Sequence, residues 1–216
     1  MKIGAIITGD IIDSTALVAE QRELMLAALR ELPAVLSAVD SNVSLEIFRG
    51  DSFQLHISDT PMALRAGVAI RAWLRSQILN SNGMVLDARL AIGIGKIDFE
   101  SGSLATSDGE AFRLSGRLLD EMTKSRLEIR TMWEPVNEQL KVATAFADDI
   151  ISSWTASQSK IILRSLLTGA SHRDVAGSLG VSRQMVTKSL KSSKEELISN
   201  YIVWFEKLIT EYLNKQ

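Results

Sequence analysis

Two aspartates in the first quarter of the chain have the chemistry of metal ligands. Asp10 follows an apolar segment, 2–8, and Asp51 lies at the tip of a predicted hairpin. Mg²⁺ prefers one or two carboxylates, keeps several waters and takes its remaining oxygens from substrate phosphates. If the strands pair, Asp10 and Asp51 can share one Mg²⁺. In the alternative interpretation, Gly50 and Asp51 form an ordinary turn, and Asp10 is a solvated loop acid or a helix cap.

Two arginines have the chemistry of phosphate ligands. Arg113 and Arg117 are four residues apart in a predicted helix and therefore share one helix face. Guanidinium groups bind phosphate oxygens through several planar donors, so the pair is predicted to bind the phosphates of a ligand. The alternative is a solvated basic face beside Glu110 and Glu121.

A third set of donors lies near the carboxyl end, in a predicted helix-turn-helix. Ser182 can cap the second helix, in which Met185, Val186 and Leu190 are predicted to face inward. Polar side chains on the other face have the donors needed for guanine, adenine and phosphate in a major groove. The residues predicted to contact DNA are Ser182, Arg183, Gln184, Thr187, Lys188 and Lys191. The alternative is an αα-hairpin with a solvated basic face.

The charge distribution favours a polyanion as the partner of this segment. The 216-residue chain has a net charge of −2, but residues 1–156 hold 15 basic and 21 acidic side chains. Residues 157–194 hold seven basic side chains and one acid, Asp174. An acidic body with a short basic segment is the pattern expected when one end of a protein contacts a polyanion such as double-stranded DNA.

Composition excludes several classes of function. The chain has no cysteine, which excludes disulfide scaffolds, cysteine zinc sites and thiol nucleophiles and favours a reducing cytoplasm. The first ten residues lack the longer apolar region and cleavage site of a secretory signal. No stretch reaches the roughly 18 apolar residues of a membrane span. We therefore expect a cytoplasmic protein without a membrane partner.

The elements that must position these side chains alternate between strands and helices. The predicted order is a strand at 2–8, a helix over 17–32 that ends near Pro33, a hairpin over 44–57, a helix opening at 59–61, a strand over 86–95, a helix over 108–122 and a strand at 127–130. This order predicts an α+β fold with a ferredoxin-like mixed sheet and helices on one face. Gly93 and Gly95 are predicted to let a ligand approach the sheet.

The pattern changes after this α+β part. We predict an α/β domain over 1–133, a connecting helix over 134–155, an all-α helix-turn-helix domain over 156–194 and an amphipathic helix over 195–216. Apolar residues cover about half the circumference of the last helix, which is too wide a face for one neighbour. It is therefore predicted to pack on its own domain and on a partner chain, as in a homodimer.

Four segments of the amino-terminal part resemble the motifs of class III nucleotide cyclases. They are 10–15 (DIIDST), 48–53 (FRGDSF), 89–95 (RLAIGIG) and 109–118 (GEAFRLSGRL). The resemblance spans about residues 3–130 and implies a cyclase-like sheet. It also implies that Asp10 and Asp51 bind metal, that Arg117 binds phosphate, and that the arginine and the aspartates come from opposite subunits of a dimer.

Three positions depart from the cyclase pattern. Ile47 occupies the position of a base-reading lysine, Thr106 that of a base-reading acid, and Arg113 that of an asparagine that contacts ribose. The resemblance therefore implies that metal and phosphate binding are kept while purine recognition and ribose positioning are lost. Binding with slow or no cyclisation is expected, because phosphoryl transfer depends on alignment of the attacking oxygen.

The carboxy-terminal part resembles another group of proteins. Residues 162–190 resemble the helix-turn-helix of sigma-factor region 4, and the combination with a cyclase-like domain resembles the SatD family. This resemblance implies a dimeric DNA-binding transcriptional regulator that binds a nucleotide or another phosphate-bearing small molecule. Two alternatives stay open, which are a Mg-dependent nucleotide cyclase or nucleotidyl transferase, and an amino-terminal domain that serves only as a dimerisation scaffold.

Overall fold

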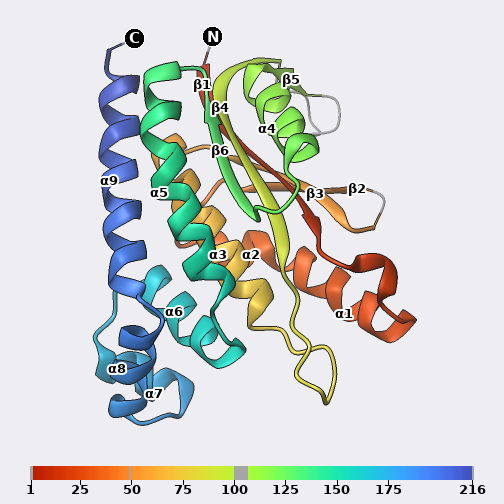
Figure 1. Ribbon diagram of the computed structural model, residues 1–216, viewed down its shortest axis with the longest axis vertical. Helices are drawn as coiled ribbons and strands as arrows, with labels where there is room; N and C mark the ends of the chain where they lie inside the picture. The colour runs from red at the N-terminus through yellow and green to blue at the C-terminus, as the bar shows by residue number, and fades with distance from the viewer. Residues whose placement is uncertain (1, 49, 100–106, 216) are drawn as a thin grey trace.

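The computed structural model describes residues 2–48, 50–99 and 107–215 (Figure 1). The strands of this part form one sheet in the order β2-β3-β1-β4-β5, and β6 also pairs with β4. Their bounds are β1 (Lys2–Ile11), β2 (Ser44–Phe48), β3 (Ser52–Ile57), β4 (Ala88–Phe99), β5 (Asp108–Gly109) and β6 (Leu127–Thr131). In the described part, no helix has the length and apolar character needed to cross a membrane.

Strand β1 lies at the centre of the sheet because β3 and β4 both pair with it in antiparallel register. Its side chains are apolar on both faces, and the adjacent Ile6 and Ile7 are both fully buried. Strands β2 and β3 form the predicted hairpin, and β6 runs parallel to β4. One βαβ unit connects β1 with β2, and another connects β3 with β4. In each unit a third strand lies between the two connected strands, as in ferredoxin-like sheets. The predicted α+β class and mixed sheet are confirmed.

Helices cover both faces of the sheet, so the prediction of helices on one face is wrong. Helices α1 (Ala19–Arg30), α2 (Leu32–Leu36) and α3 (Ala63–Arg75) share the core with Ile7, whereas α4 (Glu110–Glu121) packs beside Ile6. The close approach of α4 requires glycine, since a Cβ on Gly93 would lie 2.3 Å from the carbonyl oxygen of Ala111. Gly93 and Gly95 therefore accommodate α4 and leave no room for the ligand that the sequence predicted there.

The carboxy-terminal helices are packed into the core of the sheet. They are α5 (Glu134–Ser152), α6 (Ala156–Thr168), α7 (His172–Leu179), α8 (Arg183–Ser192) and α9 (Glu195–Leu213). The predicted boundaries at 133 and 155 fall directly before α5 and directly before α6. Buried side chains of all five helices belong to one cluster with those of the sheet. Helices α5 and α9 lie side by side in Figure 1, and the hydroxyls of Thr144 and Tyr201 join them at 2.5 Å.

A buried cluster of charges connects α3, the residue directly before β4, and α5. Arg71 is fully buried and donates to Asp87 from Nε (2.9 Å) and Nη2 (2.8 Å), and to Asp148 from Nη1 (2.6 Å). Arg75 also donates to Asp87 (2.7 Å) and to the carbonyl oxygen of Trp154 (2.5 Å). Burial by itself raises the pKa of Asp87, but the hydrogen bonds and charge of Arg71, with the charge of Arg75, hold it below the usual value. This charge cluster fixes the segment that leads into α6.

Candidate functional site

Asp10 and Asp51 lie next to each other across the pairing of β1 with β3. Asp10 is opposite Ser52 in the register, and the backbone N–H of Ile11 donates to the carbonyl oxygen of Asp51 at 3.1 Å. Both aspartates are therefore at the same end of the sheet, where β1 ends and β3 begins. The sequence predicted this juxtaposition from the apolar strand and the hairpin tip.

Each of the two carboxylates has a partner within the chain. Arg89 donates to both oxygens of Asp10, from Nε at 3.0 Å and from Nη2. Asp51 accepts hydrogen bonds from the hydroxyls of Ser14 (2.5 Å) and Ser52 (3.4 Å). The hydrogen bond to Asp10 raises the pKa of Arg89 above its usual value, so Arg89 stays charged. Its guanidinium charge balances the carboxylate of Asp10.

The donor chemistry at this end of the sheet fits a hard cation, because two carboxylates are what Mg²⁺ prefers from a protein. A metal on Asp10 would share this carboxylate with Arg89 or replace that contact. Within the described residues, no group of three or more His, Cys, Asp or Glu side chains is placed to hold a metal ion. The metal site at Asp10 and Asp51 stays a prediction.

A groove of about 340 Å³ opens beside Asp10. It is lined by residues 10–13, by Arg89 and by the loop 123–126, which contributes Lys124 and Arg126. The candidate residues inferred from the sequence did not include these three cations. Sequence spacing gave no signal for Arg89, because its position opposite Asp10 depends on the pairing of β1 with β4. Nothing in the local sequence pattern marks the loop 123–126.

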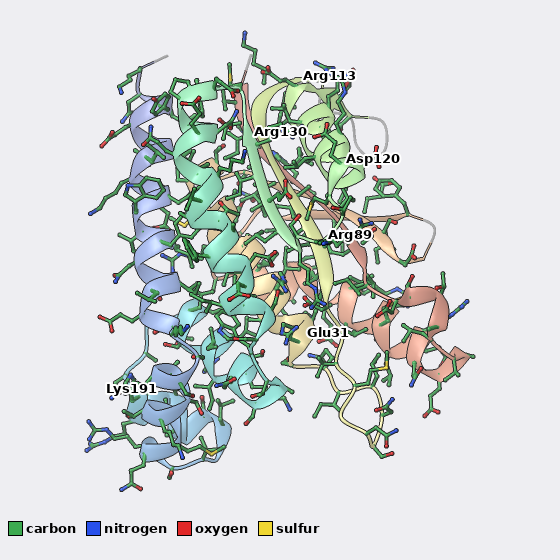
Figure 2. The ribbon with its side chains drawn as sticks, viewed as in Figure 1. Glu31, Arg89, Arg113, Asp120, Arg130 and Lys191 are labelled. Carbon is green, nitrogen blue, oxygen red and sulfur yellow. The ribbon has the colours of Figure 1, made fainter. Side chains whose placement is uncertain are left out.

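Arg113 and Arg117 lie elsewhere in the single chain. Both are exposed on the face of α4 that points away from the sheet, and neither lines the groove beside Asp10. Arg113 donates to Asp108 at 2.9 Å. Figure 2 shows Arg113 at one end of α4 and Arg89 beyond its other end. One copy of the chain therefore does not bring the predicted phosphate ligands to the predicted metal ligands.

The positions that depart from the cyclase pattern differ in their surroundings. Ile47 is half-buried on β2 and packs against the core. Arg113 is exposed on α4. Thr106 lies outside the described residues, as does Arg49 in the hairpin segment. An apolar side chain packed on the core offers no charged group to a ligand. The expected loss of purine recognition stays a prediction.

The face of α8 gathers the side chains that the sequence predicted to contact DNA. Arg183, Gln184, Thr187, Lys188 and Lys191 are all exposed and line one shallow surface, which we call the α8 face. Figure 2 shows Lys191 on the outer side of the helical part, away from the sheet.

Local capping explains why α7 and α8 begin and end where they do. The hydroxyl of Ser171 accepts from the backbone N–H of Asp174 at 3.3 Å, and that of Ser182 accepts from Met185 at 3.1 Å. Between the helices, Gly180 has a φ of 66°, a left-handed conformation that glycine adopts without strain. Among these local signals, the cap at Ser182 was predicted from the sequence. Together, the signals fix a short turn between the two helices and the start of the α8 face.

One inward residue of α8 was predicted wrongly. Val186 and Leu190 are buried as expected, but the side chain of Met185 is 42% exposed. Residues four apart, such as Val186 and Leu190, share one helix face, whereas adjacent residues are about 100° apart around the helix. Met185 therefore lies beside the buried stripe, at the edge of the exposed surface.

The α8 face has a strong excess of positive charge. Among the described residues, Arg183, Lys188 and Lys191 form no ion pair with a carboxylate. The one nearby acid in the sequence, Asp174, accepts a hydrogen bond from Ser171 at 2.6 Å at the start of α7. The α8 face thus offers donors to a negatively charged partner without first breaking a salt bridge.

Comparison with known proteins gives a similarity to solved cyclase domains. No protein-family model matches the sequence, and no curated protein matches it. The active GGEEF domain of a diguanylate cyclase from Vibrio cholerae is 16% identical, with a TM-score of 0.39 over 56% of this chain and 76% of that one. A bacterial light-regulated adenylyl cyclase is 17% identical, with a TM-score of 0.42 over 59% and 74%.

A guanylyl cyclase domain belongs to the same set. The dimeric guanylyl cyclase domain of the RhoGC fusion protein from the aquatic fungus Blastocladiella emersonii is 16% identical, with a TM-score of 0.43 over 57% of this chain and 76% of that one. Identities and TM-scores at this level assign neither an activity nor a residue's role to the present chain.

Proposed function

We propose that the chain is a dimeric DNA-binding transcriptional regulator that binds double-stranded DNA through the α8 face. The observation that carries the proposal is the gathering of Arg183, Gln184, Thr187, Lys188 and Lys191 on one exposed surface without acidic partners. DNA-binding helices of the helix-turn-helix type place such side chains in the major groove, with the preceding helix across the backbone.

The side chains of the α8 face divide into two roles. Arg183 and Gln184 are in the first turn of α8, where recognition helices contact base edges, and their donors suit guanine and adenine. Lys188 and Lys191 are further along the helix and suit phosphates, which position a protein on the duplex without reading its sequence. Thr187 is already hydrogen-bonded to His172 at 3.1 Å, a contact that ties the α8 face to the start of α7.

A homodimer is part of the proposal. Helix-turn-helix proteins usually read two half-sites related by a two-fold axis. Helices α5 and α9 expose apolar side chains that a second copy can cover, with Phe146 at 68%, Val142 at 63% and Leu197 at 58% exposure. The last helix itself cannot be the whole interface, because Ile202, Phe205 and Ile209 are fully buried within its own chain.

We further propose that the α+β part binds a nucleotide or another phosphate-bearing small molecule together with Mg²⁺. Asp10 and Asp51 would hold the metal, and Arg113 and Arg117 of a second copy would reach the phosphates. The adjacency of the two aspartates across β1 and β3 supports this part of the proposal. The SatD-like combination of a cyclase-like sheet with a helix-turn-helix is consistent with it.

The second candidate function is a Mg-dependent nucleotide cyclase or nucleotidyl transferase. The same adjacency of Asp10 and Asp51 favours it. Ile47, which packs against the core instead of offering a base-reading amine, favours binding without rapid turnover. The two candidates differ in whether the α+β part releases pyrophosphate.

Selection of duplexes from a random pool by the full-length protein tests the DNA-binding proposal. We expect enrichment of a sequence with two half-sites about one helical turn apart. Gln184→Ala should relax the preference at one base pair, whereas Lys191→Ala should weaken binding to all sequences about equally. Recovery of duplexes at background level, or an enriched sequence that neither variant changes, would contradict the proposal.

Calorimetry with a panel of nucleotides and Mg²⁺ tests the proposal for the α+β part. Asp10→Asn and Asp51→Asn should each abolish metal-dependent binding, because each removes a negative oxygen ligand. Asp149→Asn, an exposed acid on α5, is the matched control and should bind as the wild type does. Unchanged binding in both site variants would remove the metal site, and rapid pyrophosphate release by the wild type would favour the enzyme.

A further inference from the structure

A second groove, unrelated to Asp10, lies where the α+β part meets the helical part. It has a volume of about 620 Å³ and is bounded by α2, the end of α3, α6 and the end of α7. Pockets for small ligands commonly measure roughly 300–1,000 Å³ and often lie between structural units. The groove shares no lining residue with the groove beside Asp10.

The walls of this α3–α6 groove are largely apolar. Trp73 from α3 and Leu163 and Leu167 from α6 line it, and all three are half-buried. The indole N–H of Trp73 donates to the carbonyl oxygen of Ala28 at 2.9 Å, which fixes the ring in place. A fixed aromatic ring flanked by leucines is a preformed surface for the apolar body of a small molecule.

The charged groups that line the groove are both positive. Lys160 and Arg164 are one turn apart on α6, and both are exposed. No aspartate or glutamate lines the groove, and within the described part of the chain neither cation forms an ion pair. A ligand that contacts the apolar wall can therefore place an anionic group between these two side chains.

We propose that the α3–α6 groove binds a small organic anion, with an aromatic or alicyclic body against Trp73 and one carboxylate or sulfonate at Lys160 and Arg164. The apolar wall selects the body, and the unpaired cations select the charge. A ligand in this groove contacts α3 of the α+β part and α6, the helix that precedes α7 and α8. The site is independent of DNA binding and of the metal site at Asp10.

Fluorescence titration of the full-length protein with anilinonaphthalene sulfonate tests the proposal. This probe combines an aromatic body with one negative charge, and N-phenylnaphthylamine supplies the same body without the charge. We expect saturable binding of the sulfonate at one site per chain, about tenfold tighter than binding of the neutral probe. A ratio near one would overturn the assignment of charge to the ligand.

Two variants locate the bound probe. Lys160→Gln with Arg164→Gln should weaken sulfonate binding about tenfold and leave binding of the neutral probe within about twofold. Only the ion pairs between these two side chains and the bound sulfonate are lost. The matched control, Lys141→Gln with Lys207→Gln, removes two exposed cations from other faces and should bind as the wild type does. Equal affinities in the two double variants would contradict the site.

A filling substitution tests the apolar half of the site. Ala34→Phe adds a ring at the groove wall and should lower the affinity of both probes. The control, Ala145→Phe, adds the same ring on an exposed face of α5 and should bind both probes as the wild type does. Wild-type affinity for both probes in Ala34→Phe would overturn the proposal. If a second copy covers the groove instead, the affinity for the sulfonate will fall as protein concentration rises, which also overturns it.

Discussion

The arginines of this protein occur in two opposite environments. In the buried cluster, Arg71 and Arg75 are surrounded by protein, and the carboxylate of Asp87 accepts hydrogen bonds from both. On the α8 face, Arg183 and Lys188 are exposed and have no carboxylate partner in the described part of the chain. The first environment uses positive charge to hold elements together, and the second leaves it available to a partner.

The contrast shows which charged residues carry information about function. A buried cation must be paired, because an uncompensated buried charge costs several kcal/mol, so its presence reports on folding. An exposed cluster of one sign without partners contributes little to stability and produces a positive potential at the surface. The sequence shows the same difference, since acids outnumber bases in residues 1–156 and are nearly absent from 157–194.

The largest effect is expected in the buried cluster. Asp87→Asn keeps the shape of the side chain but leaves Arg71 and Arg75 without their shared negative charge, so we expect a loss of about 3–5 kcal/mol in the free energy of unfolding. Urea denaturation measures it. Asp149→Asn on the exposed side of α5 is the control and should stay within about 0.5 kcal/mol of the wild type. A small loss in Asp87→Asn would show that the buried charge cluster contributes no more to stability than exposed charges do.

The buried core also predicts that the free energy of unfolding depends on pH in the alkaline range. Burial raises the pKa of Tyr201 to about 12, although the hydrogen bond with Thr144 acts in the opposite direction. Because the folded pKa is above the unfolded value of about 10, this stabilisation is complete below pH 10 and is lost as the pH rises through 12. The free energy of unfolding should fall by about 3 kcal/mol over this range.

Tyr201→Phe isolates this contribution. The variant should lose about 1 kcal/mol at neutral pH, where the hydrogen bond to Thr144 is removed, and should lack the additional loss between pH 10 and 12. Unfolding by urea at several pH values, compared between variant and wild type, measures the difference. Parallel curves over the alkaline range would show that Tyr201 is not held neutral by its surroundings.

A smaller effect is expected at Ser182, at the edge of the α8 face. This residue caps α8 and is also predicted to contact DNA. Ser182→Ala removes the cap of α8 and should lower the free energy of unfolding by about 1 kcal/mol. Ser182→Asp keeps a capping oxygen but adds negative charge, so stability should stay near the wild-type value while DNA binding weakens. Urea unfolding and duplex binding measure the two quantities, and equal losses of DNA binding in both variants would contradict this separation.

Local sequence signals predicted most of the fold but few of its long-range contacts. Pro33, Gly180 and Ser182 lie where a helix begins or ends, because turn and cap chemistry is set by neighbouring residues. The pairing of Asp10 with Arg89 joins residues 79 apart in sequence, so spacing within a motif could not reveal it.

The same reason explains one wrong prediction for the sheet and one feature that the sequence analysis missed. Gly93 and Gly95 alternate correctly along a strand, but only the packed structure shows that α4 occupies the space above them. The buried cluster of Arg71 and Asp87 was likewise missed, since Arg71 is in a helix and its partners lie directly before β4 and in α5, with no periodic pattern that connects them.

The salt dependence of duplex binding tests the central claim most directly. For the full-length protein, the logarithm of the association constant should fall linearly with the logarithm of salt concentration. Lys188→Ala with Lys191→Ala should reduce the slope by about two units, roughly one for each lost phosphate contact, and should leave the free energy of unfolding unchanged. Lys141→Ala with Lys207→Ala should keep the wild-type slope. A wild-type slope in the α8 variant, or an equal reduction in the control, would contradict the assignment of DNA binding to the α8 face.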